Sequence, residues 1–244
     1  MKSLFTQPRQ TRLGGLTAML WSLLALVAIA DVAPLAVPFN PPNRGAPGRS
    51  STVRDAGSRG CGIIALEPTQ THWGETLQAQ PTFWVFLSEA GRTVALTLTP
   101  EGSDEILYTA TYPAIPAAGI SRLPVPEAAP ELAPDVPYRW TLSVDCPDES
   151  GDDPATTGIV VRRSPTAEFT EQLEQADVDG RITLLASHGF WYDTLTELGD
   201  QRQLAPDATE WIDAWASLLT HELVQLDDVV AQPLTDCCEV VPPP

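Results

Sequence analysis

Basic residues are scarce in this sequence, and lysine is almost absent. The 244 residues include 14 Lys plus Arg against 32 Asp plus Glu, and Lys2 is the only lysine. From residue 60 onward, seven arginines stand against 30 acidic residues, a net charge of −23. A surface of this sign repels nucleic acid and anionic lipid, which argues against both as partners. It favours solubility, and cation binding is the functional alternative.

Catalytic signatures are also missing. The sequence contains no Gly-x-Ser-x-Gly turn, no His-Glu-x-x-His helix and no glycine-rich phosphate loop. Its few histidines are scattered: His72, His188 and His221. Ser187 and His188 are neighbours on a predicted helix, so their side chains should point in different directions. We therefore expect the histidines to be structural and the protein not to be an enzyme. A hydrolase of unknown type is the least favoured alternative.

A long apolar run occurs once, at the start of the chain. It covers residues 13–30, follows a basic stretch without acids, and ends in Ala28-Ile29-Ala30 before Asp31. This is the layout of a secretory signal peptide over residues 1–30. The 18-residue run is also at the lower edge of what spans a bilayer, so an uncleaved anchor is the alternative. We expect a periplasmic or secreted protein with no membrane span after cleavage.

Four cysteines should be oxidised in that compartment. Cys61 and Cys146 bracket one region of the chain, and we predict a bond between them. Closing a loop of 85 positions would remove roughly 4–5 kcal/mol of unfolded-chain entropy in the simple loop model. Cys237 and Cys238 are adjacent, and a bond between neighbours is strained. For these two, pairing across chains and pairing elsewhere in this chain both stay open.

Composition divides the exported part into three regions. Residues 31–59 are rich in Pro, Gly, Ser and Arg and are interpreted as a flexible linker. Residues 60–163 contain short apolar segments between turn signals, which predict an immunoglobulin-like β-sandwich. The predicted strands cover 61–66, 82–88, 93–99, 105–112, 119–125, 137–145 and 157–163. Tyr138 follows a proline-rich corner, where such sandwiches place a tyrosine whose hydroxyl bonds back to upstream backbone.

The second predicted strand does not alternate. Residues 83–87 are all apolar, so both faces should be covered. One face meets the sandwich core, and we expect the helices of the same chain to cover the other; a partner or a ligand is the alternative. If these rings were exposed in a row, they would suit a carbohydrate-binding module. The candidate binding surface is Trp73, Trp84 and Phe86.

After Ser164-Pro165 the apolar period becomes 3.6, which predicts a helical appendage over residues 164–244. We predict one helix from Pro165, a second over 181–198 and a third from Pro206, followed by a loose tail over 233–244. The stretch 182–219 looks like part of a tetratricopeptide repeat. It holds at most one and a half units, so we expect a helical hairpin docked on the sandwich.

An acidic loop follows the sixth predicted strand. Hard oxygen ligands in a flexible loop suit calcium, and a solvated acidic turn is the alternative. The candidate ligands are Asp145, Asp148, Asp152 and Asp153, with Glu149 beside them. No other cofactor is expected.

Several segments together resemble a family of exported cyanobacterial proteins known only as domain of unknown function 928. The match runs over residues 44–235, and the family carries no established catalytic residues, so the resemblance implies export and a two-part design. The segments are Arg44-Gly45-Ala46-Pro47-Gly48-Arg49, Arg59-Gly60-Cys61, Pro81-Thr82-Phe83-Trp84, Tyr138-Arg139-Trp140 with Cys146, and Gly189-Phe190-Trp191-Tyr192-Asp193-Thr194-Leu195. We therefore expect an exported, non-enzymatic interaction or structural protein whose partner is another extracytoplasmic protein.

Overall fold

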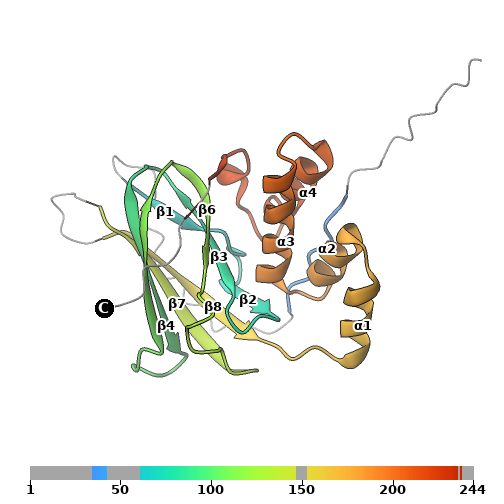
Figure 1. The fold of residues 1–244 in the computed structure, drawn as a ribbon, viewed down its shortest axis with the longest axis horizontal. Coiled ribbons are helices and arrows are strands. Elements are labelled where there is room, and N and C mark those ends of the chain that lie inside the picture. Colours follow the sequence, from blue (N-terminus) through green and yellow to red (C-terminus); the bar gives the residue numbers. More distant parts are fainter. Residues whose placement is uncertain (1–34, 43–60, 147–152, 236, 238–244) are drawn as a thin grey trace, which may run out of the picture. The chain divides into compact units, whose positions relative to one another are not determined.

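Two β-sheets and a set of helices make up the part of the chain that the computed structural model describes, residues 35–42, 61–146, 153–235 and 237 (Figure 1). The four-stranded sheet has the order β1-β3-β6-β9, and the five-stranded sheet has the order β2-β8-β7-β4-β5. Strand β2 is parallel to β8 and β9 is parallel to β6, while the remaining pairs are antiparallel. The strands are β1 Ile63–Ala65, β2 Trp73–Thr76, β3 Thr82–Leu87, β4 Arg92–Pro100, β5 Tyr108–Ile115, β6 Gly119–Pro124, β7 Pro137–Val144, β8 Ala155–Arg162 and β9 Leu234–Thr235.

The sandwich plus helical architecture is confirmed, and all seven predicted strands are present. Strands β2 and β9 were not predicted, because each contains a single large apolar side chain, Trp73 and Leu234, and so shows no pattern. The predicted loose tail over 233–244 therefore begins within the fold, because β9 pairs with β6. The predicted signal over 1–30, most of the predicted linker and Cys238 lie outside the described residues. The immunoglobulin-like and tetratricopeptide-like assignments stay predictions.

Strand β7 shows how the pattern of side chains builds the core. Four alternating side chains of this strand are at most 5% exposed: Tyr138, Trp140, Leu142 and Val144. The Trp140 ring lies 5.6 Å from that of Phe83 on β3, so the two sheets meet through large rings. The backbone N–H of Ala133 donates to the Tyr138 hydroxyl at 3.1 Å, the upstream bond expected for this tyrosine.

The helical part contains four α-helices: α1 Ala167–Gln175, α2 Val178–Ser187, α3 Trp191–Leu204 and α4 Thr209–Leu219, followed by the 3₁₀ turn η1 Asp227–Val229. The side chains of Thr166 and Asp177 cap α1 and α2. The single helix predicted over 181–198 is wrong. The chain turns at Gly189, whose φ of +81° ends α2 and lets α3 start in a new direction.

Strand β3 is covered on its second face by the helices, as expected. Trp84 is 2% exposed, and its Nε1 donates to Thr196 Oγ1 on α3 at 3.1 Å. The Trp84 ring centroid lies 6.0 Å from that of Trp215 on α4, in an edge-to-face arrangement. A Cβ at Gly199 of α3 would overlap the Trp84 ring, so the helix approaches the sheet closely only because this position has no side chain.

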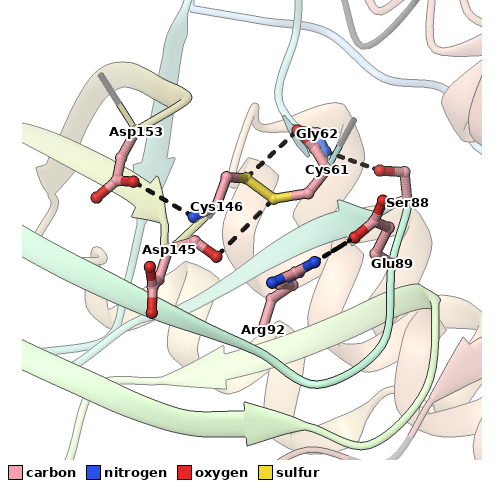
Figure 2. A network of polar contacts seen from close by, with 8 residues as sticks. All are labelled: Cys61, Gly62, Ser88, Glu89, Arg92, Asp145, Cys146 and Asp153. Atoms are coloured by element: carbon pink, nitrogen blue, oxygen red, sulfur yellow. Dashed lines mark hydrogen bonds and ion pairs between the residues drawn. A yellow bond between two sulfur atoms is a disulfide. The ribbon is translucent and has the colours of Figure 1, made fainter. Parts of the chain in front are cut away.

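The predicted disulfide is confirmed (Figure 2). Cys61 precedes β1 and Cys146 follows β7, with their Cα atoms 5.9 Å apart, so the bond joins the two sheets. The neighbouring backbone is held as well, because the N–H of Gly62 donates to Ser88 Oγ at 2.7 Å. Cys237 is also disulfide-bonded. Among the described helices, none is long and apolar enough to cross a membrane.

Part of the predicted linker is folded instead of flexible. In residues 35–42 the side chains of Val37 and Phe39 are 3% and 4% exposed and belong to the main core cluster. The proline content of this stretch concealed its two buried apolar side chains. The linker prediction over 31–59 is therefore wrong for these eight residues.

The close approach of α3 to β3 predicts that Gly199→Ala destabilises the protein. On an unobstructed helix this change would stabilise by about 1 kcal/mol, but overlap with Trp84 should turn the effect into a loss of roughly 1–3 kcal/mol. Urea unfolding measures it, with Gln203→Ala on the same helix as the control. Unchanged or higher stability of Gly199→Ala would contradict the packing described.

Candidate functional site

A buried acid and a histidine form the first candidate site. Glu67 is 3% exposed, and its Oε1 lies 2.9 Å from Nδ1 of His72. Burial raises the pKa of Glu67 to about 7, against the opposing effects of the hydrogen bond and charge of His72. The hydrogen bond with Glu67 in turn raises the pKa of His72 above its usual value. Near neutral pH the two groups therefore compete for one proton.

The backbone around this pair is held in an uncommon conformation. His72 and Gln225 have φ values of 48° and 54°, in the left-handed region that non-glycine residues seldom adopt. Gln70 Nε2 donates to Gln225 Oε1 at 2.7 Å and so ties the two turns together. Left-handed residues of this kind concentrate at functional sites, where the surrounding structure enforces them.

A small cavity of about 160 Å³ adjoins the Glu67–His72 pair. Its walls combine apolar side chains from β1 and the segment around η1, such as Ile64 and Val229, with the hydroxyls of Thr69 and Thr156. The second carboxyl oxygen of Glu67, Oε2, is buried and has no hydrogen-bond partner. That oxygen is inaccessible to solvent, so the accessible chemistry of the pair belongs to the imidazole, whose side chain is 21% exposed.

The second candidate site is a larger groove between the ends of β2 and β3 and helices α1 to α3, with a volume of about 490 Å³. At its base Asp193 is 7% exposed and accepts from Leu77 N at 3.1 Å and Gln78 Nε2 at 3.3 Å. Burial raises the pKa of Asp193 to about 6, although these hydrogen bonds lower it. This carboxyl joins the sandwich to α3, so its role in the groove is structural.

The rim of the groove is amphipathic. Arg181 and Glu197 form an ion pair that neutralises both charges. Three glutamine amides, Gln78, Gln80 and Gln201, line the groove together with Leu173 and Leu204. Leu204 is 78% exposed. The groove therefore offers groups that can donate and accept hydrogen bonds beside apolar surface.

The predicted aromatic binding surface is wrong for two of its three residues. Trp73 is 9% exposed and Trp84 is 2% exposed, because β8 and helices α3 and α4 surround them. Phe86 is half-buried and packs against the core cluster. These rings cannot form the exposed row that stacking on a sugar requires.

The predicted calcium loop falls largely outside the described residues, which do not include Asp148, Glu149 and Asp152. Asp145 is exposed, and Asp153 Oδ1 accepts from the backbone N–H of Cys146 at 3.3 Å (Figure 2). In the part of the chain that the structure describes, no group of three or more His, Cys, Asp or Glu side chains could hold a metal ion.

Ser187 and His188 lie closer together than expected, with Oγ 3.3 Å from Nδ1. Both side chains turn back to the same carbonyl oxygen, that of Leu184, at 3.1 Å and 2.8 Å. A carbonyl oxygen only accepts, so the bond from His188 places the proton on Nδ1, and this nitrogen cannot take a proton from Ser187. The two residues therefore cap the end of α2 and are not a catalytic pair.

The sequence does not predict the Glu67–His72 pair. It predicts only a structural role for His72. The two residues are five positions apart in a loop, and loop residues show no periodicity. Only the fold, which buries the carboxyl against Gly158 of β8, reveals the pairing.

The raised pKa values predict that stability falls as pH rises. Folded Glu67 keeps its proton up to about pH 7, whereas an ordinary glutamate releases it near 4.5, so the folded state binds more protons between these values. The raised pKa of His72 acts in the same direction above its usual 6.5, and that of Asp193 between about 4 and 6. We expect a loss on the order of 1–3 kcal/mol from the pair.

Urea unfolding at a series of pH values tests this linkage. Glu67→Gln should reduce the slope between about pH 4.5 and 7. Asp193→Asn should reduce it only between about pH 4 and 6. The readout is the difference from wild type, because repulsion within the acidic surface adds a slope common to all three proteins. A Glu67→Gln protein with the wild-type slope above pH 6 would contradict the assignment.

Comparisons with known proteins place the chain in a family. A family model described as Domain of Unknown Function (DUF928) matches residues 44–234. No curated protein matches the sequence. The crystal structure of Spo0M, a sporulation control protein from Bacillus subtilis, is similar at 12% identity over 47% of this chain and 54% of that chain, with a TM-score of 0.25. This chain thus spans about half of that structure's length. Since the family model covers most of its length, the chain belongs to the DUF928 family.

Proposed function

We propose that the protein is an exported, non-enzymatic interaction protein that binds an extended segment of another extracytoplasmic protein in the groove between β2, β3 and helices α1 to α3. The observation that carries this proposal is the amphipathic rim, where exposed Leu204 lies in one groove with three glutamine amides. A volume of about 490 Å³ is within the range of ligand sites.

The chemistry of the rim favours a peptide. Glutamine amides both donate and accept, as the backbone of an extended segment does. The Arg181–Glu197 ion pair leaves this part of the rim without net charge. Because Trp73 and Trp84 are buried, a sugar would find neither of the rings on which the carbohydrate reading depended.

Export is supported by two independent features. The start of the chain has the layout of a secretory signal. The Cys61–Cys146 bond belongs to oxidising compartments and is rare in the cytosol. Both features support a periplasmic or secreted location.

A photo-crosslinking residue tests the groove in the full-length exported protein. Placed at Leu204, it should give a discrete adduct in the exported fraction, because the side chain is exposed at the rim. Placed at Ile106, which is 58% exposed in the loop before β5, it should not. Combining the Leu204 probe with Gln80→Ala and Gln201→Ala should reduce the adduct about tenfold. Identical adducts at both positions, or none at Leu204, would overturn the groove assignment.

Export is tested separately by N-terminal sequencing of fractionated protein. We expect the mature chain to start near Asp31, because Ala28-Ile29-Ala30 matches a cleavage site. The protein should appear in the periplasm or the medium. Recovery of the protein in the cytoplasm with Met1 intact would rule out export.

A further inference from the structure

Residues 35–42 lie on the helices as an extended peptide would lie in a receptor (Figure 1, blue segment beside α2). Their side chains alternate: Val37 and Phe39 are buried, while Ala36, Pro38 and Asn40 are exposed. This period of two is the pattern of an extended segment with one face bound. The segment is not part of either sheet.

The surface beneath this segment is shaped to receive it. The Phe39 ring is enclosed edge-to-face by Trp191 of α3, at 5.0 Å, and by His221, at 5.8 Å. The backbone N–H of Asn40 donates to the carbonyl oxygen of Ala186 at 3.0 Å. We call this surface, made by Ala186, Gly189, Trp191 and His221, the Phe39 groove.

Gly189 is required in the Phe39 groove for two reasons. Its φ of +81° disfavours any side chain. A Cβ at this position would also lie 2.8 Å from the carbonyl oxygen of Asn40 and 2.9 Å from Cδ of Pro42. The turn between α2 and α3 therefore admits a peptide backbone that a larger residue would exclude.

The attachment of the segment permits its withdrawal. It is held by two buried side chains, by half-buried Leu35, Pro41 and Pro42, and by the backbone hydrogen bond from Asn40 to the helices. Residues 43–60 join it to the sandwich, and 18 residues can span about 60 Å when extended. Release of the segment would break no strand pairing.

We propose that the Phe39 groove is a peptide-docking site and that a second copy of this chain can fill it with its own residues 35–42. The contacts would be those already present within one chain, which is the condition for exchange of an element between copies. Residues 35–42 carry no charge, whereas the chain from residue 60 carries −23. Because the segment is uncharged and 18 residues connect it to the acidic part of the chain, two copies can exchange segments while their acidic surfaces stay apart.

The tether sets the conditions for exchange. A connection of 18 residues keeps the segment at an effective concentration on the order of millimolar near its own groove. A dilute wild-type chain should therefore be monomeric, with its groove filled from within. Exchange between copies should dominate when one chain has a free groove and another has a free segment. This inference does not depend on the groove that contains Leu204.

Two full-length variants create that situation. Phe39→Ala weakens the segment and leaves the groove intact, whereas Gly189→Ala blocks the groove and leaves the segment intact. Each should be monomeric alone, and a 1:1 mixture should form a heterodimer in analytical ultracentrifugation. Replacing the donor with the double variant Phe39→Ala, Gly189→Ala should abolish the heterodimer. A mixture that stays monomeric at every concentration up to about 0.1 mM overturns exchange between copies.

A capped, fluorescent peptide of residues 35–42 tests the groove directly. It should bind Phe39→Ala chains about tenfold more tightly than wild-type chains, whose own segment competes, and a peptide with Ala in place of Phe39 should bind about tenfold more weakly. Equal binding to both chains, or none to folded Phe39→Ala chains, overturns the proposal. If Phe39→Ala fails to fold, a fluorophore on Ala36→Cys in the otherwise wild-type chain replaces it. Excess peptide should then lower the anisotropy of the displaced segment, and an unchanged anisotropy overturns docking.

Discussion

The burial of both faces of β3 is the constraint on which the rest of the structure depends. A strand with apolar side chains on both sides cannot lie on the outside of a two-layer sandwich, so a third layer must cover it. Trp84 meets this demand by contacting α3 and α4 at once, through Thr196 and Trp215. The helices depend on the sheet to the same degree, because Trp215 would otherwise lose its cover. Sandwich and helices should therefore unfold as one unit.

The features that could be read from the sequence are those that repeat along the chain. Short apolar segments between turn signals predicted the seven main strands, and the run of apolar residues in β3 predicted the docking of the helices. Helical periodicity failed around Gly189, because apolar residues continue at helical spacing across the three residues that separate α2 from α3, and only Gly189 has a left-handed backbone there. Strands β2 and β9 were missed because each has only one large apolar side chain.

The candidate sites could not be read in this way, because they depend on contacts between residues far apart in the chain. Asp193 lies on α3 but finds its partners at Leu77 and Gln78, beyond the end of β2. Glu67 acquires its raised pKa only when β8 closes over it. The composition of residues 35–42 predicts a linker, because proline is common in both linkers and bound peptides and the alternation covers only two buried positions. With 32 acidic residues, the sequence also does not indicate which few carboxyls are buried.

The disulfide also determines how the protein would carry a mechanical load. Tension arriving along residues 43–60 reaches Cys61 immediately before β1, a strand of three residues that a pulling force would peel from β3. The covalent bond to Cys146 instead passes the force to the end of β7, which lies in the middle of the five-stranded sheet with β8 on one side and β4 on the other. Force along β7 loads many backbone hydrogen bonds together in shear, so the short strand β1 is protected from extension.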